Sequence, residues 1–141
     1  VFGEFWYRPR PGRGITIDPA WSESNIVTTT LPVLGQVRCH RLMVPQLRSA
    51  MLELQSRGLA NLVRTNDGCY NPRMQVSNDE AISRHAFGVA IDVNAGTNGY
   101  GAPSTQDMRL VQIMERWGFV WGGTWTVPDA MHFEFGAFPS P

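Results

Sequence analysis

The sequence predicts a single domain that mixes helices with short strands. Its 141 residues are enough for one hydrophobic core and too few for two independent ones. Hydrophobic residues make up 43% and charged residues 17%, as is typical of a folded globular protein. Residues 44–57 and 104–117 carry apolar side chains at helical spacing, whereas 25–30, 88–94 and 131–135 have the composition or alternation of strands.

Charge and hydropathy argue against two classes of partner. Twelve acidic side chains balance twelve basic ones, so we expect no nucleic-acid partner and no attraction to an anionic membrane. The chain has no apolar run of about eighteen residues, so we expect no transmembrane segment. It starts at Val1 without methionine, from which we expect that a signal peptide, an anchor or another domain has been removed.

Residues 1–35 are expected to form an N-terminal arm and loops that pack on a core of residues 36–141. The composition of residues 1–14 turns from aromatic to arginine, proline and glycine. Such an arm could contact a polyanion, but aromatic residues more often cover a core edge, and we favour that interpretation. Short strand-like pieces follow between residues 15 and 37.

The two cysteines, Cys39 and Cys69, have no CxxC spacing that would indicate a metal or redox pair. A disulfide is the leading interpretation, and it implies an oxidising compartment. Closing a loop of about thirty residues would stabilise the fold by roughly 3 to 4 kcal/mol in the loop-entropy model. Two buried thiols are the alternative.

The first predicted helix runs from about residue 44 to 57. Pro45 is tolerated in its first turn, and Gly58 is suited to its exit. Its apolar face consists of Leu47, Ala50, Met51 and Leu54. Residues 59–65 are then predicted to form a strand, followed by a turn at residues 66–68.

A second helix is predicted after the Gly/Asn-rich loop at residues 97–103. Ser104 and Asp107 have the spacing of a capping box, and Gly118 is suited to the C-terminal cap. The stripe expected to enter the core is Met108, Val111, Met114 and Trp117. Residues 119–121 then have the composition of a strand.

The stretch SRHAFGVAID, residues 83–92, places an imidazole and a carboxylate among small and apolar residues. From Gly88 the alternation of a strand puts Asp92 on a face with small neighbours, where a metal or substrate could approach. His85 and Asp92 would lie on opposite faces of a continuous strand. We therefore expect Gly88 to change the chain direction and His85 to lie before the strand.

The stretch DAMHFE, residues 129–134, adds a second imidazole. His132 and Glu134 share one face of the predicted strand, which can face the same cleft as Asp92. His85, Asp92 and His132 would supply two nitrogens and one oxygen and leave a fourth position for water, as in catalytic zinc sites. The third histidine, His40, has no acidic neighbour in a motif, and we interpret it as structural.

Four further residues are assigned roles around this site. Asp129 is the expected general base and then acid. Arg73 would bind a substrate carboxylate or stabilise an oxyanion, with Ser83 also assigned to substrate binding. Glu134 would orient a histidine ligand. Spacing alone leaves open that the histidines are incidental and that Arg73 is a solvated or structural ion-pair residue.

Residues 83–92 resemble the SxHxxGxAxD motif of the VanY-type zinc D-Ala-D-Ala carboxypeptidases, and residues 129–134 resemble their second motif, with His132 as third ligand. The segment CYNPR, residues 69–73, resembles the one that carries the family's substrate-binding arginine, here Arg73. The resemblance extends over roughly residues 36–136 and leaves the first 35 without a firm match.

The resemblance implies an α+β fold of the LAS-type or Hedgehog-like peptidase kind, with a small antiparallel sheet, flanking helices and a zinc-bearing cleft. It implies one Zn²⁺ per chain and a peptidoglycan peptide substrate. We accordingly expect a secreted, cell-surface or periplasmic monomer of bacterial or phage origin.

The residue at position 129 departs from the carboxypeptidase pattern. The family commonly has Glu three residues before the last histidine, whereas Asp129 is similar to some phage-type L-alanyl-D-glutamate endopeptidases of the same superfamily. Hydrolysis by either type is therefore expected. The alternative function is a non-catalytic, zinc-stabilised module that binds cell wall or protein, and the intact Asp129 argues against it.

Overall fold

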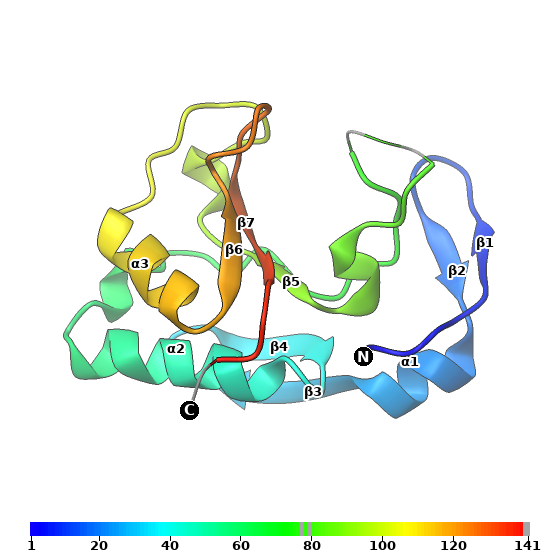
Figure 1. Cartoon of the computed structure of the whole chain (residues 1–141), viewed down its shortest axis with the longest axis horizontal. Coiled ribbons are helices and arrows are strands. Elements are labelled where there is room, and N and C mark those ends of the chain that lie inside the picture. Colours follow the sequence, from blue (N-terminus) through cyan, green and yellow to red (C-terminus); the bar gives the residue numbers. More distant parts are fainter. Residues whose placement is uncertain (77, 79, 140–141) are drawn as a thin grey trace.

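The computed structural model describes residues 1–76, 78 and 80–139, and its mixed α/β fold has three antiparallel sheets and three α-helices (Figure 1). Two sheets are hairpins: β1 (Tyr7–Pro9) with β2 (Ile15–Ile17), and β3 (Ile26–Leu31) with β4 (Gly35–His40). The third has the order β5-β7-β6, formed by β5 (Ala90–Asp92), β7 (Asp129–Phe135) and β6 (Phe119–Gly122). The predicted combination of antiparallel strands and helices is therefore present.

The main core lies between the third sheet and the helices α2 (Val44–Ser56) and α3 (Met108–Arg116). The predicted apolar face of α2 is buried along its whole length. In the sheet, Phe133 of β7 is fully buried opposite Ile91 of β5. Because side chains alternate along a strand, their neighbours on β5 and β7 point to the other face, which carries the candidate site. No helix within the described ranges is long and apolar enough to cross a membrane.

The predicted strand at residues 59–65 is wrong. The segment contains a short 3-10 helix, Ala60–Leu62, followed by extended chain. The Oδ1 atom of Asn94 accepts hydrogen bonds from the backbone N–H groups of Arg64 and Thr65, at 2.7 and 3.2 Å. One side chain thus satisfies the donors that a strand partner would have satisfied, and no ladder forms there.

Residues 15–37 contain a helix, α1 (Pro19–Asn25), where the sequence predicts only short strand-like pieces. The side chain of Asp18 caps this helix by accepting from the N–H of Ala20 at 3.0 Å. Pro19 interrupts a strand but is favourable in the first turn of a helix, because its fixed φ suits that position and no N–H is needed. The predicted strand at residues 25–30 corresponds to β3.

The start of α3 differs from the predicted capping box. Asp107 caps the helix by accepting from the N–H of Arg109 at 2.9 Å, and Ser104 accepts from Gln106 within the preceding loop. Met108 is 51% exposed and does not belong to the core stripe, so that assignment is wrong. Gly118, with φ of +90°, ends the helix as predicted.

The N-terminal residues lie against the main core and a smaller one. The ring of Phe2 packs on His40 and Phe135, with centroids 5.0 and 4.8 Å away. Buried His40 also contacts the carbonyl oxygen of Phe2 through Nε2 at 3.2 Å, which gives this histidine a structural environment. Phe5 packs on Trp21, whereas Trp6 is 48% exposed.

Cys39 and Cys69 form the predicted disulfide, which joins β4 to the segment beside the candidate site. We expect the Cys39→Ser/Cys69→Ser double variant to lose about 3 to 4 kcal/mol of unfolding free energy, because the unfolded chain regains the entropy of a closed loop. Urea unfolding of the metal-free protein measures this loss. Reduced wild type is the control and should lose a similar amount; a loss below about 1 kcal/mol in both would contradict the entropic argument.

Candidate metal centre and pocket

Three side chains from separate elements converge at the third sheet. His85 lies on a short 3-10 helix, η2 (Arg84–Phe87), whereas Asp92 ends β5 and lies opposite His132 in the antiparallel register with β7. Asp92 Oδ2 lies 3.2 Å from His85 Nε2, and Asp92 Oδ1 lies 3.4 Å from His132 Nδ1. The two ring nitrogens are 3.2 Å apart. The structure therefore brings the three predicted ligands together.

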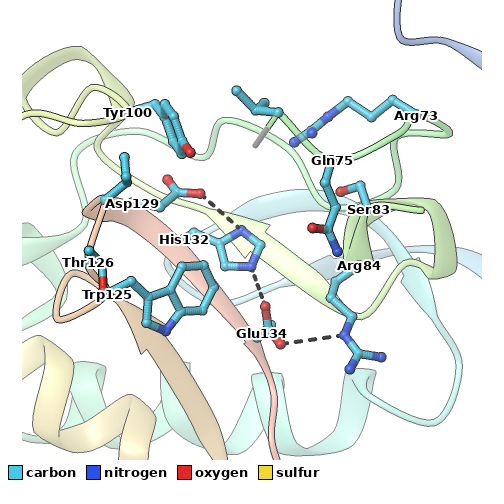
Figure 2. Close-up of a pocket in the computed structure, with 12 residues that line it drawn as sticks. Arg73, Gln75, Ser83, Arg84, Tyr100, Trp125, Thr126, Asp129, His132 and Glu134 are labelled. Atoms are coloured by element: carbon cyan, nitrogen blue, oxygen red, sulfur yellow. Dashed lines mark hydrogen bonds and ion pairs between the residues drawn. The ribbon is translucent and has the colours of Figure 1, made fainter. Parts of the chain in front are cut away.

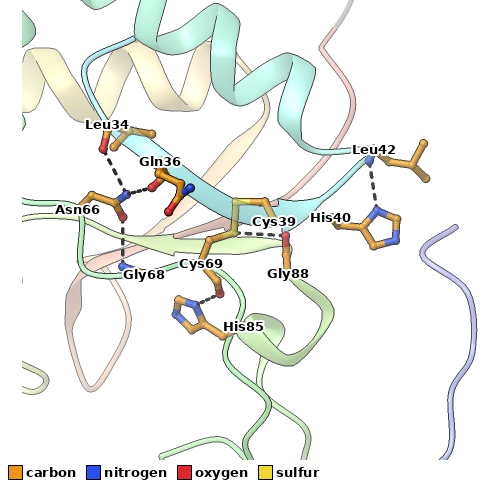
Figure 3. The surroundings of a disulfide bond; sticks show 10 residues. All are labelled: Leu34, Gln36, Cys39, His40, Leu42, Asn66, Gly68, Cys69, His85 and Gly88. Carbon is orange, nitrogen blue, oxygen red and sulfur yellow. Dashed lines mark hydrogen bonds between the residues drawn. A yellow bond between two sulfur atoms is a disulfide. The ribbon is translucent and has the colours of Figure 1, made fainter. Parts of the chain in front are cut away.

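Backbone contacts orient His85. Ser83 Oγ caps η2 by accepting from the His85 N–H at 3.1 Å, and Gly88 ends η2 with φ of +68°. A Cβ at Gly88 would lie 2.7 Å from the backbone nitrogen of His40, so only glycine suits both the conformation and the space. The carbonyl of Cys69 lies 2.8 Å from His85 Nδ1, beside the disulfide (Figure 3). Since a carbonyl only accepts, Nδ1 carries the proton and Nε2 presents a lone pair to the cluster.

Glu134 contacts His132, and both side chains lie on the same face of β7. Its Oε1 lies 2.9 Å from His132 Nε2, and its Oε2 lies 3.5 Å from the Nε of Arg84 (Figure 2). A carboxylate at Nε2 favours the proton on that nitrogen and leaves Nδ1 directed at Asp92. This is the geometry expected of a residue that orients a histidine ligand.

The donor set fits a tetrahedral metal ion. Zinc bonds to nitrogen and oxygen are about 2.0 to 2.1 Å long, so tetrahedral angles separate two ligand atoms by about 3.3 Å. The measured separations of 3.2, 3.4 and 3.2 Å agree with that value. Asp92 Oδ1 is buried and has no hydrogen-bond partner of good geometry among the described residues, which is unusual for a carboxylate oxygen. His85, Asp92 and His132 could therefore hold a metal ion.

In the metal-free protein, Asp92, His132 and Asp129 have shifted pKa values. Burial opposes the charge of Asp92, but contacts with the His132 and His85 rings outweigh it and lower the pKa of this carboxyl. Burial likewise opposes the charge of His132, but contacts with Asp92 and Glu134 raise its pKa to about 9. Burial raises the pKa of Asp129, and nearby His132 offsets only part of that effect. An arriving cation must therefore displace a proton from His132.

We expect the metal-free protein to lose stability as the pH rises from about 6.5 to 9. The pKa of His132 is raised to about 9 in the folded state, against about 6.5 when unfolded. Its protonation therefore stabilises the fold fully below the unfolded value, and this contribution disappears as the pH passes the folded one. The loss has an upper limit of about 3 kcal/mol. Urea unfolding in chelator, at pH 6 and pH 9, tests this; the His132→Gln variant should show a smaller difference, and equal differences would contradict the assignment.

A pocket of about 350 Å³ opens over His132 (Figure 2). Asp129 begins β7 and lies in this pocket, with Oδ2 3.9 Å from His132 Nδ1. Arg73 lies on the other side of the pocket, so the structure brings both predicted catalytic residues to one cavity. The remaining lining residues are Gln75, Val76, Ser83, Arg84, Tyr100, Trp125, Thr126, Val127 and Glu134.

A family model described as D-alanyl-D-alanine carboxypeptidase matches residues 77–135. This segment matches a peptidase family. The predicted resemblance is therefore confirmed over a segment that contains the three candidate ligands and Asp129, whereas Arg73 lies before it. No curated protein and no solved structure shows significant similarity to the chain.

The sequence reasoning assigned no role to seven of the twelve pocket residues, among them Trp125, Tyr100 and Arg84. Trp125 is 39% exposed, and its ring centroid lies 5.4 Å from that of His132. Tyr100 is 41% exposed at the same side of the pocket, and Arg84 pairs with Glu134. Tyr100 and Trp125 could have been noticed because they lie in Gly-rich turns without apolar periodicity. A large aromatic ring in such a turn is not explained by burial in the core, so it indicates a binding surface.

Proposed function

We propose that the protein is a zinc metallopeptidase that hydrolyses peptide bonds in the stem peptides of bacterial peptidoglycan, outside the cytoplasm of a bacterium or as a phage product. The observation that carries the proposal is the convergence of two imidazole nitrogens and a carboxylate at tetrahedral separations, beside Asp129 in an open pocket. The match to a carboxypeptidase family supports the reaction class. The LAS-type fold is part of the same proposal.

Zinc is the metal that this donor set favours. Two nitrogens and one oxygen at tetrahedral spacing suit Zn²⁺, whereas Ca²⁺ and Mg²⁺ prefer six or more oxygen ligands. Three protein ligands leave one coordination position open, as in catalytic zinc sites, whereas structural zinc sites have four protein ligands. We therefore assign one Zn²⁺ per chain to His85, Asp92 and His132.

In the proposed mechanism Asp129 moves the proton. A bound zinc ion would polarise the scissile carbonyl and acidify water at the open position. Asp129 lies in the pocket next to His132, takes a proton from the attacking water and returns it to the leaving amine. In the metal-free protein, burial raises the pKa of Asp129, which makes its carboxylate a stronger base than an exposed one.

Arg73 and Ser83 are the proposed substrate-binding residues. The guanidinium group of Arg73 points toward the pocket and can bind a substrate carboxylate or stabilise an oxyanion. A carboxylate lies close to the scissile bond in both candidate reactions, D-Ala-D-Ala carboxypeptidase and L-Ala-D-Glu endopeptidase. The arginine is therefore compatible with either bond.

Digestion of purified peptidoglycan, with and without chelator, tests the proposal. Mass spectrometry of the released fragments should show free D-Ala for a carboxypeptidase, or a cut between L-Ala and D-Glu for an endopeptidase. Chelator should abolish either product, and added zinc should restore it. Zinc bound at one equivalent without any product would instead favour a non-catalytic binding module.

A further inference from the structure

The β1–β2 hairpin continues into the wall of the pocket. Gly14, just before β2, lies opposite Arg73 in an isolated antiparallel bridge. Two backbone hydrogen bonds flank this bridge: Ile15 N to Pro72 O at 3.1 Å, and Met74 N to Arg13 O at 2.8 Å. The segment that carries Arg73 is therefore paired with the end of the hairpin through this bridge.

The other edge of the Arg73 segment leads directly to a candidate metal ligand. The N–H of Ser83 donates to the carbonyl of Arg73 at 3.0 Å, and the N–H of Gln75 donates to that of Ala81 at 2.7 Å. Ser83 in turn caps the helix turn of His85. One continuous series of hydrogen bonds therefore joins the N-terminal hairpin, the Arg73 segment and the candidate metal centre.

A side-chain contact and a small core strengthen this connection. The Nη1 atom of Arg13 donates to the carbonyl of Gln75 at 2.8 Å, so Arg13 contacts the Arg73 segment through both its backbone and its side chain. Ile15 and Ile17 of β2 are 3% and 6% exposed. They form a second hydrophobic cluster, with Met74 among its partly buried members. The hairpin is thus packed beneath the pocket wall.

The Arg73 side chain has little else to position it. Within the described residues its guanidinium donates one hydrogen bond, at 3.4 Å, to the carbonyl of its neighbour Met74. Its placement therefore depends on the backbone of the segment, which is held on one edge by the hairpin. Both the hairpin and Arg73 lie outside the segment that matches the peptidase family.

We infer that the N-terminal hairpin is a specificity element of the pocket, in which Arg13 is a positioning residue that holds Arg73 against the carboxylate of a peptide substrate. The inference rests on the proposed function for the identity of the substrate. It assigns to the hairpin, residues 7–17, a role in recognition in addition to packing.

Kinetics on a stem peptide and on the same peptide with its carboxylate amidated tests this role. Arg13→Ala should raise KM roughly 10-fold for the carboxylate peptide, because a charge-assisted hydrogen bond to the Gln75 carbonyl is lost. It should leave kcat, zinc content and the KM of the amide nearly unchanged. Arg13→Lys, which keeps a donor, should recover most of the loss. In an Arg73→Ala background, Arg13→Ala should have no further effect.

Arg10→Ala is the matched control. Arg10 lies on the same hairpin and carries the same charge, and its described contact to the chain is through its backbone N–H, which donates to Gly14. An equal KM increase for Arg10→Ala would show that the loss of a positive charge alone explains the effect, and it would overturn the inference. Equal effects of Arg13→Ala on the carboxylate and amide peptides, or effects that add to those of Arg73→Ala, would overturn it as well.

Amide hydrogen exchange separates this inference from the proposed function. The N–H groups of Met74 and Ser83 bond to the hairpin and to the Arg73 carbonyl, so both should exchange faster in Arg13→Ala than in Arg10→Ala. Unchanged exchange would overturn the positioning role whatever the protein cleaves. Faster exchange in a protein that cleaves no stem peptide would support the positioning role and reject the proposed substrate.

Discussion

Replacement of Asp129 by asparagine should leave the metal ion bound and lower kcat by about 10³-fold, within the usual contribution of a general base. Asparagine has the same size but cannot accept the proton of the attacking water. Asp129 Oδ2 lies 3.9 Å from His132 Nδ1 and is not one of the three converging ligand atoms, so zinc content should stay at wild-type level. Metal analysis and steady-state kinetics on a stem peptide give the two readouts.

Asp129→Glu is the informative control for that variant. It keeps the carboxylate and corresponds to the residue common in the carboxypeptidases that the sequence resembles, so measurable turnover should remain. If Asp129→Asn cleaves at the wild-type rate, another group moves the proton. If it loses zinc together with activity, Asp129 belongs to the ligand set and the tetrahedral assignment is incomplete.

Replacement of Asp92 by asparagine should weaken zinc binding by more than about 100-fold, the upper end of the effect of losing an outer partner of a ligand. Asp92 lies within 3.4 Å of both ring nitrogens and is the only carboxylate of the described three-residue cluster. An amide oxygen keeps the shape but supplies no negative charge to a divalent cation. Competition with a fluorescent zinc chelator measures the affinity.

Glu134→Gln is the comparison for the ligand variant. Glu134 contacts His132 on the nitrogen that faces away from the cluster, so its loss should cost about 10- to 100-fold in affinity. The expected order of affinities is wild type, then Glu134→Gln, then Asp92→Asn. An Asp92→Asn protein that bound zinc like the wild type would remove this carboxylate from the site.

The candidate ligands could be predicted because strand alternation is a local property. A period of two places His132 and Glu134 on one face, and Gly88 allows the turn that moves His85 ahead of β5. The interatomic distances could not be predicted, because they depend on the register that sets Asp92 opposite His132 across forty residues of sequence.

Other features depended on partners that the local sequence does not reveal. Residues 59–65 have a strand-like composition, but Asn94 satisfies the N–H groups of Arg64 and Thr65 from about thirty residues away. The bridge between Gly14 and Arg73 spans an even longer separation. Periodicity reports which face of an element is apolar, whereas these contacts are set by the topology of the whole chain.

From the contact between Cys69 and His85 we expect an order in the maturation of the protein. Cys69, whose carbonyl contacts the ring of the candidate ligand His85, is also joined to β4 by the disulfide. While the thiols are reduced, no cross-link to β4 fixes the position of the Cys69 carbonyl. The His85 ring is then less restrained, so binding a cation costs more conformational entropy. We expect oxidation to precede efficient metal capture, so that chains kept in a reducing environment stay metal-poor and acquire their ion after the cross-link has formed.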